Sequence, residues 1–164
     1  MILFRPVGLE ELRLIDAAGM RAFPPRLPEQ PIFYPVLNEE YARQIARDWN
    51  TKQHSLVGFV TRFEVEDAYV AKFERRVVGS RVHEELWVPA EELAEFNRHI
   101  DGRIDVVAAY FGEGWRELVG DVSDTAVLFK RLADAEVRRP DLVEILRDEA
   151  AGLRAFVRAR PPGA

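Results

Sequence analysis

Alternating hydrophobic and polar positions predict several β-strands in this chain. Between residues 56 and 65, Val57, Phe59, Thr61, Phe63 and Val65 alternate with glycine and charged residues, which predicts a strand with one buried face. Short apolar runs predict further strands over residues 2–5 and 104–110. Within residues 81–93 the pattern predicts a strand that runs into a helix, and residues 68–73 fit either a strand or a short helix.

Apolar residues three or four positions apart predict helices between and after these strands. One helix is expected over residues 9–18, with Gly19 placed to end it. Asn38 can cap a second helix, in which Tyr41, Ile45 and Trp49 recur at every fourth position. A third is expected to start at Pro89, and two more are expected after Ser123 and Pro140. The prolines between residues 24 and 31 predict an irregular loop.

The order of these elements favours an α+β fold in one domain with a helical addition. We expect an α/β core over residues 1–111 and a helical C-terminal extension over residues 112–164. The apolar stripe of the extension includes Val127, Leu128, Leu146, Leu153 and Val157. That stripe is expected to pack on the core or on a second chain. In the second case the protein would form a homodimer through its C-terminal helices.

Composition narrows the classes of function. The chain has 164 residues, a net charge of −5, no cysteine and three histidines. An acidic chain is a poor match for the phosphate backbone, so duplex-DNA binding is not expected. Thiol chemistry is excluded because there is no cysteine. No apolar run has the length of a membrane span or of a signal-peptide core, so no membrane association is expected and the cytoplasm is the expected location.

The candidate chemistry is concentrated in the segment from Arg81 to Leu93. On a strand, His83, Glu85 and Trp87 would share one face, because side chains two positions apart point the same way. A partly desolvated Glu85 could hydrogen-bond a sugar hydroxyl and oppose the positive charge of an oxocarbenium-like transition state. His83 could orient a ribose hydroxyl or Glu85. The alternative is an ordinary solvated glutamate beside an ordinary strand histidine, and spacing alone favours this alternative.

Three residues nearer the N-terminus are candidates for holding a nucleotide. Arg5, at the end of the first strand, could pair with a phosphate or a ribose edge, or it could be an exposed cation without a ligand. Phe33 and Tyr34 could stack on a base or on a nicotinamide ring, although aromatic residues in a strand more often belong to the core. We expect one of these two rings to point inward and the other outward.

The standard nucleotide, hydrolase and metal motifs are missing from the sequence. It contains no GxGxxG, GxxxxGK[ST] or GxSxG pattern. Its histidines, at positions 54, 83 and 99, do not have the HExxH spacing of zinc enzymes, so no metal is expected.

Four segments resemble a family of small bacterial proteins commonly labelled "ADP-ribosylation/crystallin J1". These segments are residues 3–8, 23–35, 46–50 and 87–93. The label points toward ADP-ribosylglycohydrolases, which are all-helical metal enzymes. The strand-rich pattern instead looks like the ADP-ribosyltransferase fold, with a split β-sheet core, that mono-ADP-ribosyltransferases, poly-ADP-ribose polymerases and RNA 2′-phosphotransferases share.

The resemblance to that superfamily implies that the chain uses NAD as a substrate. Its members grip NAD with a His or Arg on the first strand, an aromatic or Ser on a middle strand and a Glu on a later strand. Arg5, Phe33 or Tyr34, and Glu85 occur in that order here. Glu85 and His83 would then be catalytic, and Arg5, Phe33, Tyr34 and Trp87 would bind the cofactor. His83 stands where many Arg-specific transferases carry Gln or Glu, and the Ser-Thr-Ser motif is missing.

Two functions follow as expectations. The first is an NAD-dependent ADP-ribosyltransferase or NAD glycohydrolase, whose acceptor is protein, nucleic acid, a small molecule or water. The second is a catalytically inactive module of the same fold that binds a nucleotide or a protein. RNA-phosphate transfer is a third hypothesis. It would require more basic residues around the expected nucleotide-binding cleft than the sequence contains.

Overall fold

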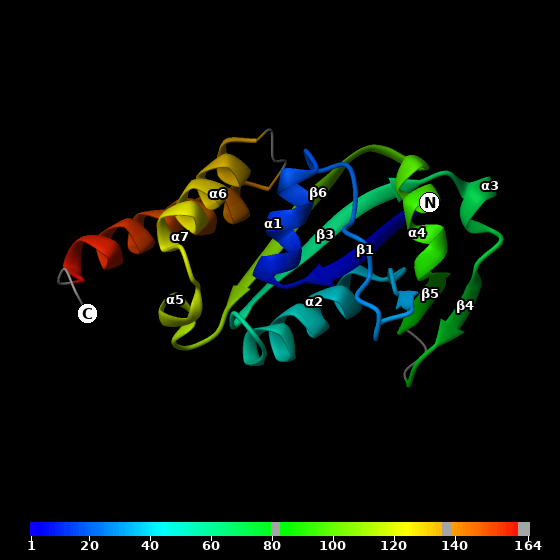
Figure 1. Ribbon diagram of the computed structural model, residues 1–164, viewed down its shortest axis with the longest axis horizontal. Helices are drawn as coiled ribbons and strands as arrows, with labels where there is room; N and C mark the ends of the chain where they lie inside the picture. The colour runs from blue at the N-terminus through cyan, green and yellow to red at the C-terminus, as the bar shows by residue number, and fades with distance from the viewer. Residues whose placement is uncertain (80–82, 136–138, 161–164) are drawn as a thin grey trace.

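The strands form two three-stranded antiparallel sheets. The computed structural model describes residues 1–79, 83–135 and 139–160. The first sheet has the order β1-β3-β6, with β1 at Ile2–Val7, β3 at Val57–Val65 and β6 at Ile100–Phe111. The second has the order β2-β5-β4, with β2 at Ile32–Phe33, β4 at Glu74–Val77 and β5 at Glu84–Pro89. Strands β4 and β5 lie at one end of the molecule (Figure 1). The mixture of helices and strands expected from the sequence is confirmed.

Val36 connects the two sheets. It pairs with Phe4 of β1 on one side and with Glu85 of β5 on the other. The amide of Val36 donates to the carbonyl of Phe4, and the amide of Phe4 donates back to Val36, at 2.8 and 2.9 Å. The pairing of β2 with β5 has the same register as the Val36 bridge, because Ile32 faces Pro89 and Phe33 faces Val88. The segment from residue 32 to residue 36 therefore links both sheets.

Helix α2 (Glu39–Asp48) covers one face of the first sheet. It begins where the sequence predicts, because the side chain of Asn38 accepts a hydrogen bond from the amide of Tyr41 at 3.1 Å. Its buried residues are Tyr41, Ala42 and Ala46, which pack with Phe4 and other residues of the sheet. The predicted stripe is wrong at its end: Trp49 is 52% exposed, because the helix has ended and a 3-10 turn (Asn50–Lys52) follows.

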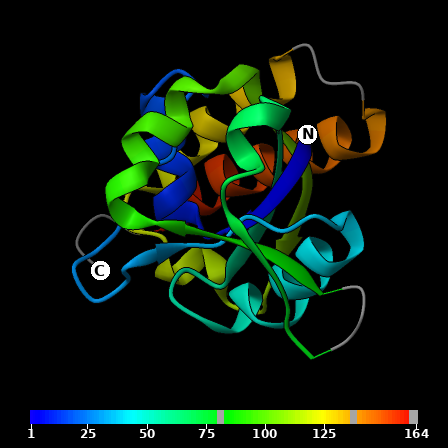
Figure 2. The ribbon, with the colours of Figure 1, turned by 90° about the vertical axis from the view of Figure 1, so that its right-hand side faces the viewer.

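Helix α1 (Leu9–Ala17) belongs to the opposite face of that sheet, with α4 (Leu93–Arg98) (Figure 2). Leu9, Leu12 and Ile15 are buried, as their spacing predicts. Gly19 adopts a positive φ of 68°, and its amide donates a hydrogen bond to the carbonyl oxygen of Asp16. This conformation ends the helix at the predicted place. The main hydrophobic core lies on this side of the sheet and includes Phe33 and the buried residues of α4.

The C-terminal helices share the same core. They are α5 (Trp115–Leu118), α6 (Val122–Asp134) and α7 (Pro140–Ala159). The ring of Phe129 lies 5.8 Å from that of Phe59 on β3 and 5.8 Å from that of Phe111 on β6. Leu146 and Leu153 of α7 are completely buried in this cluster. In the described part of the chain, no helix is long and apolar enough to cross a membrane.

The structure differs from the sequence-based elements between residues 67 and 104. Residues 67–70 form the short helix α3 (Asp67–Val70), so the helical alternative for this segment holds. Strand β4 follows, although its pattern does not predict a strand, and β6 begins at Ile100 rather than at residue 104. Pro89 closes β5 instead of opening a helix; a 3-10 turn (Ala90–Glu92) separates it from α4. Residues 81 and 82 of the expected strand lie outside the described part.

Candidate functional site

The side chains of strand β5 alternate between the core and an outer face. Leu86 and Val88 are completely buried, whereas Glu85 and Trp87 are partly exposed. Glu85 and Trp87 therefore share the outer face, as alternation along a strand requires. His83 precedes the strand and is partly exposed. We define the Glu85 face as the outer surface formed by Tyr34, Arg76, His83, Glu85 and Trp87, together with Tyr41, which is buried and contacts Glu85 from α2.

Tyr41 holds one oxygen of the Glu85 carboxylate. Its hydroxyl donates to Oε1 of Glu85 at 3.1 Å. Burial raises the pKa of Tyr41 to about 12, and the negative charge and hydrogen bond of Glu85 act in the same direction. Tyr41 consequently remains a donor at neutral pH. Its ring also stacks on that of His83, with centroids 4.0 Å apart and planes 12° apart, while Nδ1 of His83 lies 3.1 Å from the carbonyl oxygen of Val78.

Trp87 forms the second half of this face with Arg76 and Tyr34. The guanidinium carbon of Arg76 lies 3.6 Å from the centre of a Trp87 ring, a cation–π contact. The ring of Tyr34 meets that of Trp87 edge-on at 5.3 Å. Arg76 is directly opposite Glu85 in the β4–β5 register, so both side chains lie on the same face. Arg76 also pairs with Glu74 at 2.9 Å, and 43% of its side-chain surface is exposed.

The two neighbouring aromatic residues of the β2 segment point in opposite directions. Phe33 is completely buried and packs against the rings of Phe23 and Phe96. Tyr34 is partly exposed beside Trp87. The expectation of one ring inward and one outward is confirmed. Because Phe33 belongs to the core, only Tyr34 is left to stack on a ligand.

Arg5 is engaged inside the protein. Its guanidinium donates from Nε to Oε1 of Glu11 at 2.8 Å and from Nη2 to Oε2 at 3.2 Å. It also donates to the carbonyl of Tyr34 and lies 4.6 Å above the ring of Phe33. Arg5 is 8% exposed. These contacts account for a structural role, because a bidentate ion pair and a cation–π contact already satisfy the charge.

Arg5 and Glu85 are not brought together on one face of the sheet. Phe4 and Glu85 both pair with Val36, so the side chains of these three residues lie on the same face. Arg5 follows Phe4 on β1 and points to the opposite face. The contacts agree with this, since Phe4 packs with Tyr41 and Arg5 packs on Phe33. A single nucleotide groove lined by both Arg5 and Glu85, as their joint role in holding NAD would require, is therefore not formed by these side chains.

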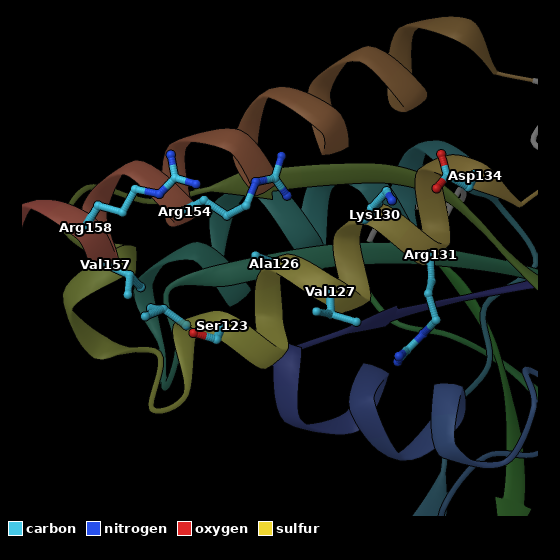
Figure 3. A pocket seen from close by; sticks show the side chains of 10 residues that line it. Ser123, Ala126, Val127, Lys130, Arg131, Asp134, Arg154, Val157 and Arg158 are labelled. Carbon is cyan, nitrogen blue, oxygen red and sulfur yellow. The ribbon is translucent and has the colours of Figure 1, made fainter.

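Two hollows of the molecule lie away from the Glu85 face. One, of about 570 Å³, lies between α6 and α7 (Figure 3). Another, of about 840 Å³, is lined by residues of β3, β6 and α7 and includes Arg62, Asp105 and Arg139. None of the six residues of the Glu85 face lines either hollow. The Glu85 face lies beside the first turn of α2, from which Tyr41 contacts Glu85. Within residues 1–79, 83–135 and 139–160, no cluster of His, Asp and Glu could hold a metal ion.

Sequence reasoning missed Tyr41 and Arg76. Tyr41 looked like a core residue of α2, and the signal for its role was its position three residues after the Asn38 cap, in the first helical turn. Arg76 lies on a strand whose four residues are all exposed, so no hydrophobic alternation marks it. Only the register of β4 against β5 brings it to Glu85.

Comparisons with protein-family models, with curated proteins and with solved structures give no match for this chain.

Proposed function

We propose that the Glu85 face binds a nucleotide of the NAD type. The observation that carries the proposal is the β4–β5 register, which sets Arg76 opposite Glu85 and over the ring of Trp87. These groups match the three parts of a nucleotide. Trp87 and Tyr34 offer aromatic surface for a base, the Glu85 carboxylate can accept from ribose hydroxyls, and Arg76 can pair with a phosphate.

The arrangement of strands supports a finer assignment of the fold. Two small antiparallel sheets joined through Val36 resemble the split sheet of an ADP-ribosyltransferase-like core, and α5 to α7 would be its helical extension. The proposal transfers the role of the cation from Arg5 to Arg76. It does so because Arg5 is buried against Glu11, whereas Arg76 is partly exposed beside Glu85.

ADP-ribosyl transfer or NAD hydrolysis is the second candidate, and the contact between Tyr41 and Glu85 favours it. Tyr41 fixes Oε1 of Glu85, which leaves Oε2 to accept from the nicotinamide ribose. In the reaction the C1′–N bond breaks and nicotinamide leaves with the electron pair. The Glu85 carboxylate stabilises the positive charge of the ribosyl group, and an acceptor oxygen or nitrogen, or water, then bonds to C1′ and releases a proton. The acceptor is a protein, a nucleic acid, a small molecule or water.

A calorimetric titration with NAD tests binding at this face. We expect the unaltered protein to bind NAD, and Glu85→Gln and Arg76→Gln each to weaken binding about tenfold, because each removes one charge-assisted hydrogen bond. Glu84→Gln and Arg75→Gln are matched controls, since these neighbours lie on the same two strands and point to the opposite face. Both controls should bind NAD as the unaltered protein does.

Nicotinamide release separates the two candidates. Release that disappears in Glu85→Gln would establish the transferase or hydrolase, and NAD binding without release would establish the binding module. Absence of NAD binding would overturn both. Binding that Glu84→Gln weakens as much as Glu85→Gln would reject the Glu85 face as the site.

A further inference from the structure

The groove between α6 and α7 combines apolar side chains with several cations. We call it the α6–α7 groove, and its lining residues are best seen in Figure 3. Its apolar floor includes Ala126, Val127 and Val157. Val127 is 52% exposed and Val157 is 38% exposed, although both belong to the apolar stripes of their helices. These stripes are therefore only partly covered by the core.

Cations line the rim of the same groove. Lys130 of α6 and Arg154 and Arg158 of α7 all contribute to its lining. In the described part of the chain, none of these three forms an ion pair with an acidic side chain, whereas Arg131 pairs with Asp16 of α1 and Asp134 with Arg147. The whole chain carries a net charge of −5. A cationic groove on an acidic protein selects for a partner of opposite charge.

We propose that the α6–α7 groove binds an acidic amphipathic helix of a partner protein. Arg154 and Arg158 are four residues apart on α7, so they lie one turn apart on the same side. In Figure 3 they form a row above Val157, Ala126 and Val127. A partner helix with glutamates four residues apart and an adjoining apolar stripe would match both rows, as in helix-in-groove recognition.

Charge also argues against a symmetric dimer through this groove. In a two-fold interface the same patch meets itself. Lys130, Arg154 and Arg158 of one copy would then face the same cations of the other, and repulsion between like charges would oppose association. A small amphiphile is less suitable, because Val127 and Val157 are too exposed to enclose most of a ligand's surface.

A synthetic helical peptide tests the proposal. The probe is a fluorescein-labelled, alanine-based peptide with one leucine stripe and two glutamates four residues apart. Its control carries lysine in place of both glutamates. We expect fluorescence anisotropy to show binding of the acidic peptide only, with affinity that falls as salt is added. The double variant Arg154→Glu, Arg158→Glu should weaken binding by about tenfold or more.

A matched double variant separates the groove from overall charge. Lys52→Glu, Arg103→Glu changes the net charge equally at exposed positions outside the α6–α7 groove, and should leave peptide binding unchanged. Circular dichroism confirms that both double variants are folded. No binding of the acidic peptide, equal binding of both peptides, or equal loss in the two double variants would overturn the proposal. Binding only to anionic phosphatidylserine vesicles, or a dimer in sedimentation that blocks the peptide, would overturn it as well.

Discussion

The pKa of the Tyr41 hydroxyl depends on burial and on the neighbouring carboxylate of Glu85, so its titration probes the Glu85 face. Its pKa is raised to about 12, first by burial and then by the charge of Glu85. The folded state thus favours the neutral phenol. The resulting stability is fully present below the unfolded pKa of about 10 and is lost as the pH rises from there through about 12.

Glu85→Gln should lower the pKa of Tyr41 toward its ordinary range, because the negative charge is removed. Titration of the tyrosine Cζ signals by ¹³C NMR measures this, with Tyr41→Phe to assign the signal. The titrations of the other tyrosines are the internal control. An unchanged Tyr41 titration in Glu85→Gln would contradict the contact.

The ion pair between Arg5 and Glu11 should contribute to stability rather than to ligand binding. Glu11→Ala leaves the guanidinium of Arg5 buried without its carboxylate, and Glu11 is 21% exposed, so water partly compensates. We expect the free energy of unfolding to fall by about 2–3 kcal/mol, measured by urea denaturation. The exposed Glu144 of α7 provides the control, and Glu144→Ala should change the free energy of unfolding by less than about 0.5 kcal/mol. Equal effects of the two changes would contradict this role.

Individual side chains show where sequence reasoning stops. That the side chains of His83, Glu85 and Trp87 share one face could be predicted, because it depends only on their spacing along the chain. The engagement of Arg5 could not, because Glu11 reaches it from a helix and Phe33 from another strand. Nothing in the local pattern distinguishes an arginine that binds a ligand from one that binds a neighbouring carboxylate.

Helix α2 and strand β3 approach each other closely at a glycine. A Cβ atom on Gly58 would lie 2.2 Å from the carbonyl oxygen of Ala46 and 2.9 Å from Cβ of Asn50. This contact explains why Gly58 and Val60 are buried on a strand that the sequence predicts to have one exposed face. The covering helix is distant in sequence, so the alternation within β3 cannot reveal it.

Gly58→Ala should therefore destabilise the protein by about 2–3 kcal/mol, because the clash is with backbone that cannot move without displacing α2. Gly120→Ala is the matched change, since a Cβ at Gly120 would meet nothing within 4 Å. Thermal denaturation of the two variants measures the difference. A Gly58→Ala protein as stable as Gly120→Ala would show that α2 does not pack on β3 as described.

Elements were predictable where their own sequence carries a strong signal. The Asn38 cap and the Gly19 stop depend on local hydrogen bonds, and both helix ends lie where expected. Strand β4 has no buried residue, so it depends on its pairing with β5. Pro89 can begin a helix or end a strand, and its pairing with Ile32 of β2 places it at the end of β5. Tertiary contacts decided these segments.

Across the whole molecule, the Glu85 face and the α6–α7 groove are separate surfaces on one packed core. The first is formed by the second sheet with Tyr41 of α2, and the second by the C-terminal helices. Phe129 packs against both β3 and β6, so the helices that line the groove also stabilise the first sheet. Assembly of a site from β4, β5 and α2 depends on this long-range packing, and the sequence alone could name only some of its residues.

The most direct test of nucleotide binding at the Glu85 face is to follow the indole N–H signals of the three tryptophans by NMR during titration with NAD. Trp87 should shift with a saturable dependence on NAD, because it lies on the proposed site beside Arg76. Trp115, buried between Phe111 and Phe129, and Trp49, exposed at the end of α2, should not shift. An unchanged Trp87 signal at the highest NAD concentration, or a shift confined to Trp49 or Trp115, would contradict the account.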